Sequence, residues 1–426
     1  MSDIHTTSFR YDSACSEMDI KPHPYIIKMF DKEKEETVIW ANRGDFKENM
    51  YLYLAGNNKL LTDCRLTDQD CLALYKTLEN NLYVVSLDLR YNNITDEGAE
   101  HLAKLIEGTA GLHDLNLMGN DIGPDGAERI AKALQTNETL QSLRMTGNKI
   151  GNKGGMCFAQ ALQVNTTLEA LDVGDTDMTI ESVIAMATVL NQNKTLKALN
   201  VNRPILFTHQ EETTVHFSRM LKVNRSLEEL HLQKYDMRDF GATRLAECLM
   251  ENYTLTYLDL SCNRITRDGT KELAKVLKKD TALKTLDLGF NRLEDDGAMH
   301  LADALATCNM TLETLVIVSN NIASKGLCAL ADSMKTNTSL TRVFIWGNKL
   351  EEPACIAFAN LVETGRLDLA DTDVKPYVVD GVTSLCEQNN HIRRHYYYAP
   401  SYGDDVPSWQ PLGVHVPRSR EITFKV

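Results

Sequence analysis

Hydrophobic positions recur along this chain in one phrase, L-x-x-L-x-L-x-x-N. The last positions of the copies are 57, 92, 120, 148, 176, 204, 235, 263, 291, 320 and 348. These eleven copies are mostly 28 residues apart, with longer steps of 35, 31 and 29 residues. Asparagine fills eight of the last positions, whereas Thr176, Pro204 and Tyr235 replace it in the middle. The chain is therefore built from one repeated unit.

Each copy has two halves with different periods. The alternating L-x-L piece predicts a short strand with one buried face, and the second half has helical spacing, as in Ala127, Ile130, Ala131 and Leu134. Glycines open these helices, and acidic residues lie near their first turns: Gly98, Gly126, Gly241, Gly269 and Gly297, with Asp96, Asp125, Asp239 and Asp295. We expect these carboxylates to cap free backbone N–H groups.

One such unit cannot bury its own apolar stripe, so the units must stack. The pattern predicts an α/β solenoid shaped as a horseshoe, with parallel strands on the concave face and helices on the convex face. We expect an N-terminal cap over residues 1–48, the solenoid over 49–372 and a C-terminal extension over 373–426. The last unit of the solenoid is degenerate, and its strand is expected at Leu367–Leu369. Ile26, Ile27, Met29 and Phe30 would supply the apolar contacts of the cap.

The recurring asparagine is expected to turn the chain at the end of each strand. Its amide can donate to and accept from backbone groups that would otherwise stay unpaired. The structural turn asparagines are Asn92, Asn120, Asn148, Asn263, Asn291, Asn320 and Asn348.

This repeat resembles the ribonuclease-inhibitor-like class of leucine-rich repeats over roughly residues 50–372. The least generic stretches resemble one member family more closely: residues 87–92, 144–150, 202–206, 345–349 and 395–398. That resemblance implies a non-enzymatic protein of germ, stem or ciliated cells. It also implies a role in differentiation or in a cilium, and a place in the nucleolus, cytoplasm or axoneme.

Charge and cysteine usage narrow the class of partner. The net charge of −14 disfavours a general binder of nucleic acid. The ten cysteines are scattered singly, and the N-terminus lacks the order of a secretory signal, so we expect an intracellular protein. The longest nearly apolar run, Val183–Leu190, is too short to cross a membrane, and no membrane partner is expected.

Three motifs suggest chemistry that their contexts do not support. The N-x-[ST] sequons at Asn137, Asn165, Asn193, Asn224, Asn252, Asn309 and Asn337 lie three residues before the first leucine of a unit. We interpret them as asparagines in the left-handed conformation of a helix end. The glycine-rich Gly147–Gly155 stretch lacks the order of a phosphate loop, and His391 and His395 have no third ligand spaced with them. We predict no cofactor, no metal, no catalytic residue and no enzymatic activity.

The repeats depart from consensus at three places. The unit after Pro204 is longer, with Ile205–Thr214 ahead of its helix, which is either a binding insertion or a local kink. A column of outward strand residues is polar for eight units and then becomes apolar at Val316 and Phe344. The apolar patch expected on the concave face is Phe290, Val316, Val318, Phe344 and Trp346. An apolar surface of this kind usually binds something.

The third departure is the C-terminal extension, which is rich in aromatic residues. Its candidate anchors are Tyr396, Tyr397, Tyr398, Tyr402 and Trp409. Either these residues or a partner protein would cover the apolar patch, and the extension is favoured because it is tethered. The sequence favours a protein–protein interaction scaffold or adaptor in a larger assembly. The alternatives are a GTPase-activating protein and an inhibitor that wraps a basic enzyme.

Overall fold

The computed structural model describes residues 2–31, 49–57, 65–206, 211–279 and 281–388. Strands and helices alternate along the chain, and the eleven repeat strands form a parallel sheet in chain order, β1 to β11. The predicted α/β repeat fold is therefore confirmed. The chain divides into two compact units between Leu199 and Asn200.

The repeat strands are β1 (Met50–Tyr53), β2 (Val84–Asp88), β3 (Asp114–Asn116), β4 (Ser142–Arg144), β5 (Ala170–Asp172), β6 (Ala198–Asn200), β7 (Glu229–His231), β8 (Tyr257–Asp259), β9 (Thr285–Asp287), β10 (Thr314–Val316) and β11 (Arg342–Phe344). The helices that follow them are α3 (Asp68–Leu78), α4 (Asp96–Gly108), α5 (Pro124–Thr136), α6 (Gly151–Val164), α7 (Ile180–Val189), α8 (Glu212–Val223), α9 (Asp239–Leu249), α10 (Arg267–Leu277), α11 (Glu294–Thr307), α12 (Ser324–Thr336) and α13 (Glu352–Glu363).

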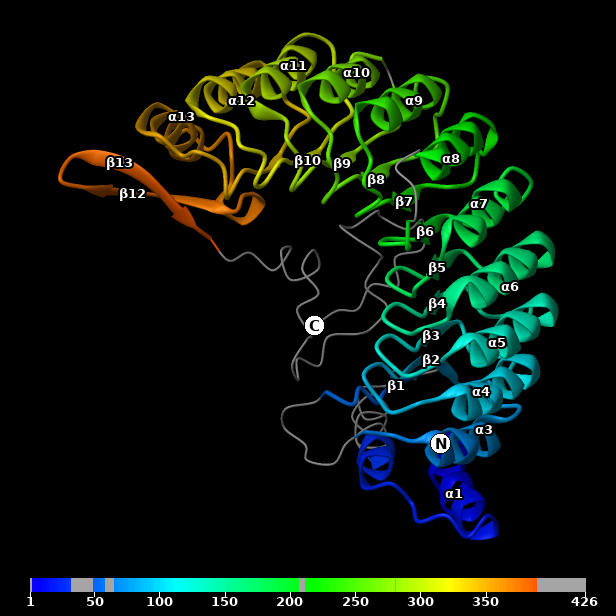
Figure 1. Ribbon diagram of the computed structural model, residues 1–426. Helices are drawn as coiled ribbons and strands as arrows, with labels where there is room; N and C mark the ends of the chain where they lie inside the picture. Colours follow the sequence, from blue (N-terminus) through cyan, green and yellow to red (C-terminus); the bar gives the residue numbers. More distant parts are fainter. Residues whose placement is uncertain (1, 32–48, 58–64, 207–210, 280, 389–426) are drawn as a thin grey trace. The chain divides into compact units, whose positions relative to one another are not determined.

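Strand pairing within each unit places equivalent positions of successive repeats side by side. Leu115 of β3 pairs with Leu143 of β4 in the first unit, and Leu258 of β8 pairs with Leu286 of β9 in the second. All four leucines are buried. In each unit the helices lie along one side of the strands (Figure 1). The strand side chains that point away from the helices form a second surface, which we call the strand face.

Carboxylates near the helix starts cap the helix of the following repeat. Asp96 Oδ1 accepts hydrogen bonds from the backbone N–H groups of Gly123 and Gly126 at 2.6 and 2.9 Å. The same contact joins Asp68 to Gly98, Glu211 to Gly241, Asp239 to Gly269 and Asp295 to Gly326. Asp125 instead forms an ion pair with Lys153 Nζ at 2.6 Å. Most of the expected caps are present, but the helix that each one caps belongs to the next repeat.

The N-terminal segment packs against the first repeat. Helix α1 (Ser2–Glu17) contacts α3, and the Tyr25 hydroxyl donates to the carbonyl of Tyr53 in β1 at 3.0 Å. Residues 24–31 are helical, and Ile26, Met29 and Phe30 are buried there. The described part of this segment covers the apolar end of the first repeat.

The C-terminal end differs from the sequence prediction. The worn last strand expected at Leu367–Leu369 is replaced by a 3-10 turn over Leu369–Asp371, because the Asp368 side chain accepts from the backbone N–H of Ala370. An antiparallel hairpin then follows, made of β12 (Val374–Val379) and β13 (Val382–Glu387). It packs against α13, so the extension begins with regular structure.

After β11, two polar side chains bind the backbone groups that the last repeats leave unpaired. Arg366 donates to the carbonyls of Met334, Asn337 and Leu340 at 2.7, 2.5 and 2.8 Å. Asp373 is fully buried and accepts from the backbone N–H groups of Ile345 and Trp346 at 2.9 and 3.0 Å. These two residues satisfy backbone groups that a further repeat would otherwise bind.

Candidate functional site

The turn asparagines connect neighbouring repeats. Asn120 Nδ2 donates to the carbonyls of Leu117 in its own repeat and Leu89 in the preceding one, both at 2.9 Å. Its Oδ1 accepts from the backbone N–H of Ile94 at 3.3 Å. Comparable contacts are made by Asn92, Asn148, Asn263, Asn291, Asn320 and Asn348. These amides are used for holding the repeats together.

Two of the three repeats that lack this asparagine use a hydroxyl group in its place. The Tyr235 hydroxyl donates to the carbonyl of Val201 at 2.9 Å and is completely enclosed, which raises the pKa of Tyr235 well above its usual value. The Thr176 hydroxyl donates to the carbonyl of Val173 at 2.6 Å. Both contacts replace an amide donor of the turn, so these positions carry the same structural role.

A second set of asparagines lies at the sequons. Asn137 Oδ1 accepts from the backbone N–H groups of Thr139 and Leu140, and its Nδ2 donates to the carbonyl of Ile106 in the preceding repeat. The expected left-handed conformation is wrong, because φ is −78° at Asn137 and −71° at Asn165. The side chain binds the end of the preceding helix, α4, and the start of the segment that follows it, so extended backbone suffices. The Asn137 amide is therefore buried and bonded within the fold.

The strand face of the second unit brings together part of the predicted apolar patch. Val316 at the end of β10, Val318 two residues after it and Phe344 at the end of β11 form a buried cluster, and these residues are 3, 6 and 3% exposed. Trp346 is half-buried, and Phe290 is 37% exposed. We call Val316, Val318 and Phe344 the apolar cluster. The predicted patch therefore divides into the buried apolar cluster and two more exposed residues, Phe290 and Trp346.

The polar column beside this cluster shapes the strand ends. Asp259 Oδ1 accepts from the backbone N–H of Ser261, and Asp287 Oδ1 accepts from that of Gly289, at 2.9 and 2.7 Å. The same contact, from a side chain to the N–H two residues later, occurs at Asp88, Asn116, Asp172 and Asn200. Short Asp and Asn side chains favour this local bond. At most repeats the column side chains thus stabilise the turn after the strand. Their polarity alone did not predict this structural role.

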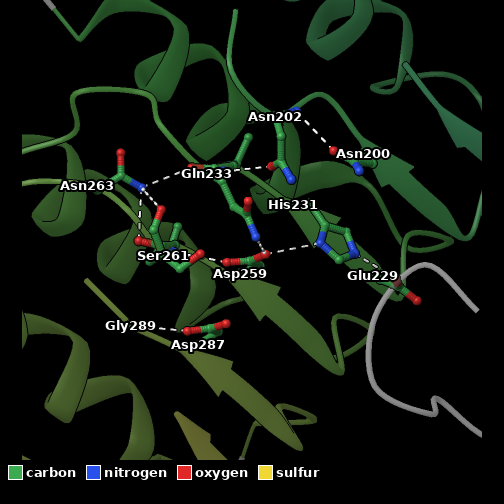
Figure 2. Close-up of polar contacts among 12 residues, drawn as sticks. Asn200, Asn202, Glu229, His231, Gln233, Asp259, Ser261, Asn263, Asp287 and Gly289 are labelled. Atoms are coloured by element: carbon green, nitrogen blue, oxygen red, sulfur yellow. Dashed lines mark hydrogen bonds and ion pairs between the residues drawn. The ribbon is translucent and has the colours of Figure 1, made fainter. Parts of the chain in front are cut away.

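His231 departs from this rule and lies in a cluster of polar side chains on the second unit (Figure 2). Its Nε2 lies 2.6 Å from Glu229 Oε1, and its Nδ1 lies 3.2 Å from Asp259 Oδ2. Gln233 Nε2 donates to the same Asp259 oxygen at 2.5 Å. The imidazole also lies against the ring of Tyr257, with centroids 4.9 Å apart. Strands β7 and β8 supply these groups, except Gln233, which follows β7.

The charge state of His231 follows from its two carboxylate neighbours. Burial alone would lower the pKa of the imidazole, but hydrogen bonds and the negative charges of Asp259 and Glu229 outweigh it and raise the pKa to about 10. The imidazolium present at neutral pH donates from both nitrogens. It therefore balances two carboxylates that are themselves buried. We interpret this cluster as a structural ion network.

Several predicted residues lie elsewhere. The anchors Tyr396, Tyr397, Tyr398, Tyr402 and Trp409, and the histidines His391 and His395, lie outside the described residues. The sequence reasoning missed the hairpin, whose exposed side chains include Tyr377, Val378, Val379 and Val382. Their strand-like run beside an Asp-Gly turn was the signal that could have found it.

The described part of the chain contains neither a metal-ligand group nor a membrane-spanning helix. No three His, Cys, Asp or Glu side chains are grouped there as ligands for a metal ion. None of the described helices combines the length and apolar character needed to cross a membrane.

The comparisons with known proteins agree with the repeat geometry. A leucine-rich repeat family model matches residues 80–103, 112–131, 136–159, 164–187, 251–274, 279–302 and 308–331. Leucine-rich repeat-containing protein 34 from Mus musculus is 52% identical over 414 residues, 96% of this chain and 99% of the relative. The chain belongs to the leucine-rich repeat-containing protein 34 family. The closer resemblance predicted from residues 87–92 and 345–349 is thus confirmed.

Shorter matches extend across mammals. The relative of the same name from Rattus norvegicus is 56% identical over 209 residues, 49% of this chain and 50% of the relative. The Homo sapiens relative is 56% identical over 204 residues, 48% of this chain and 44% of the relative. In these two matches, the aligned stretch spans about half of each relative or less.

Two solved structures are similar at a lower level. Actin-binding site 2 of leiomodin-1 matches with a TM-score of 0.29 and 22% identity, over 32% of this chain and 78% of that one. An internalin from Listeria monocytogenes matches with a TM-score of 0.36 and 16% identity, over 78% of this chain and 88% of that one.

Proposed function

We propose that this chain is a non-catalytic protein–protein interaction scaffold or adaptor in a larger assembly. Leucine-rich repeat proteins in general bind protein partners through extended surfaces. One observation carries the proposal: polar groups that could have suggested chemistry are used inside the fold. The turn amides bind backbone carbonyls, the column carboxylates accept backbone N–H groups, and His231 lies between two acids. The outer surface of the array is left to bind other molecules.

We further propose an intracellular location, in the cytoplasm, the nucleolus or a ciliary axoneme. The buried sequon asparagines support it, since Asn137 and Asn165 are 6 and 5% exposed and their amides are already bonded. A glycan could not be attached there without opening the helix end. The role in differentiation or in a cilium rests on the family resemblance alone.

No observation favours a GTPase-activating protein, and one speaks against a wrapping inhibitor of a basic enzyme. Such an inhibitor would present carboxylates to its target along the strand face. Asp259 and Asp287 instead are 1 and 0% exposed and bind neighbouring backbone groups. The net negative charge of the chain therefore does not by itself indicate a basic target.

The test is the size of the assembly that contains the native chain. An epitope-tagged chain, expressed at its natural level, is purified at physiological salt and its mass distribution is measured by mass photometry. We expect a particle of defined mass, larger than the 47.9 kDa chain, with fixed partner stoichiometry. A population that consists of the free chain alone would contradict the scaffold proposal.

A further inference from the structure

The strand face of the second unit is buried, although it points away from the helices of that unit (Figure 1). Tyr257 of β8 is 1% exposed, and Asp287 of β9 and Thr314 of β10 are 0% exposed. Neighbouring side chains on a strand face shield one another mainly from the sides, since successive strands lie about 4.8 Å apart. A ring as large as that of Tyr257 therefore needs a cover that lies on the face.

Buried carboxylates indicate the charge of this cover. Glu229 and Asp287 are 3 and 0% exposed, and Asp259 lies between them on β8 (Figure 2). In the described part of the chain, His231 is the cation shown in contact with this group, through Glu229 and Asp259. One imidazolium cannot neutralise three carboxylates, and a buried charge without a counter-charge is strongly destabilising. The cover is therefore expected to carry positive charge.

The cover is best sought within the chain itself. Glu229, Tyr257 and Asp287 have further interactions within the chain, beyond the contacts named above. These are the same side chains whose burial and charge call for a cover. A partner protein or a second copy is thus not needed to bury them.

The segment 389–426, which lies outside the described residues, is tethered beside this face. Gln388 directly precedes it and donates its backbone N–H to the carbonyl of Asp373 at 2.9 Å. Asp373 in turn accepts from the N–H of Ile345, the residue that follows β11. Four strand spacings from β11 to β7 amount to about 20 Å, whereas a segment of this length reaches about 100 Å when extended.

The composition of this segment matches the expected cover. It carries five basic residues against three acidic ones, on a chain whose net charge is −14. The basic residues are Arg393, Arg394, Arg418, Arg420 and Lys425. Arginine stays charged when buried, and its planar fork matches a carboxylate. The tyrosines at 396–398 add apolar surface next to the first two arginines.

We propose that arginines of residues 389–426 bind Glu229 and Asp287, so that this segment closes the strand face of the second unit. The contact is autoinhibitory, because a partner that binds this face has to displace the segment. In that consequence the inference rests on the scaffold function proposed above, whereas the contact itself does not.

The first test is carboxyl footprinting of the purified full-length chain, with a carbodiimide and glycine ethyl ester and a mass-spectrometric readout. One variant removes the four arginines: R393A/R394A/R418A/R420A. Labelling of Glu229 and Asp287 should be about tenfold or more faster in this variant than in wild type. Asp303 and Asp332 serve as internal references, because their side chains are 61 and 67% exposed on α11 and α12 and should be labelled equally in both chains.

A matched control removes the same number of charges from exposed lysines of α8, α10 and α12: K222A/K271A/K275A/K325A. It should leave the labelling of Glu229 and Asp287 at the wild-type rate. Equal acceleration in the control would overturn the proposal, since the effect would then be one of overall charge. Unchanged labelling in the arginine variant would overturn it as well.

A second test locates the segment without removing any charge. A photoreactive p-benzoylphenylalanine in place of Tyr396 is irradiated in the full-length chain, and the cross-linked peptides are identified by mass spectrometry. We expect links to peptides that contain strands β7–β11. Links that avoid these strands would overturn the proposal, as would links between light and heavy copies in an isotope-mixed sample, which would assign the cover to a second copy. These outcomes do not depend on the mass of the native assembly, so this proposal and the scaffold proposal fail separately.

Discussion

Asp239 Oδ1 accepts a hydrogen bond at 3.0 Å from the backbone N–H of Gly269, thirty residues further along the chain. A Cβ built on Gly269 would lie 2.6 Å from that same oxygen. The acid of one repeat and the glycine of the next therefore form a single helix cap that needs both residues. The carboxylate reaches the start of the next helix only because the next helix has no side chain at that point.

The first prediction replaces that glycine. Gly269→Ala should lower the free energy of unfolding by about 1–3 kcal/mol, because the new methyl group overpacks the cap. Urea denaturation measures the change. Gly108→Ala is the matched control, since nothing lies within 4 Å of a Cβ built there. A loss at Gly108 as large as that at Gly269 would show that the cap contact is not the cause.

The second prediction removes one turn amide. Asn120→Ala leaves the N–H of Ile94 and the carbonyls of Leu89 and Leu117 without this partner, and should cost about 1–3 kcal/mol of unfolding free energy. Denaturation midpoints provide the measurement, with the exposed Asn191→Ala as control. An unchanged midpoint for Asn120→Ala would mean that its bonds to neighbouring repeats contribute nothing.

The third prediction concerns His231 and pH. The pKa is raised from 6.5 to about 10 in the folded chain. The stabilisation is therefore complete below pH 6.5 and declines as the pH rises toward 10, since the unfolded chain loses its proton first. His231→Gln should cost about 3–5 kcal/mol near neutral pH, because two buried carboxylates lose their cation.

The measurement is urea denaturation of wild type and His231→Gln across this pH range. The difference in unfolding free energy between them should shrink as the pH rises, while the titrations of groups far from His231 cancel in the comparison. A difference that is independent of pH would show that the imidazole carries no charge in the folded chain.

The fourth prediction concerns the end of the array. Asp373→Ala removes the acceptor for the N–H groups of Ile345 and Trp346, at a cost of about 1–3 kcal/mol. Hydrogen exchange should accelerate at those two amides and in the hairpin, and less in the first unit. Uniform acceleration across the chain would indicate global destabilisation in place of a lost end cap.

The fifth prediction places a charge in the apolar cluster. Phe344 is 3% exposed, so Phe344→Asp should destabilise the second unit by more than about 3 kcal/mol. Limited proteolysis of the extension after residue 388 distinguishes its possible contacts. Faster cleavage there, compared with Phe344→Leu, is expected if the extension contacts this cluster. Unchanged cleavage with loss of a bound protein would assign the cluster to a partner.

The repeat fold could be predicted because its signal is periodic and local. Leucine spacing, the turn asparagines and the helix-start glycines each recur at one position of the unit, and each matches an element of the structure. Contacts between repeats could not be read in this way. The sequence places Asp239 near the start of its own helix, but only the stacking distance reveals that it caps Gly269.

The surface was harder to predict because side-chain chemistry alone does not report burial. Val316 and Phe344 read as an exposed patch, yet they are buried together. Asp259 and His231 read as one polar column, yet one shapes a turn and the other balances two acids. The hairpin was missed because it follows the last repeat, where the period no longer guides the assignment.

Cross-linking mass spectrometry of the native assembly with an amine-reactive reagent tests the scaffold account most directly. Lys234 follows β7 and Lys271 lies on α10, and both are exposed. The account predicts links from exposed lysines of the array to partner proteins at fixed stoichiometry. Links confined to the chain itself, in an assembly of native composition, would contradict it.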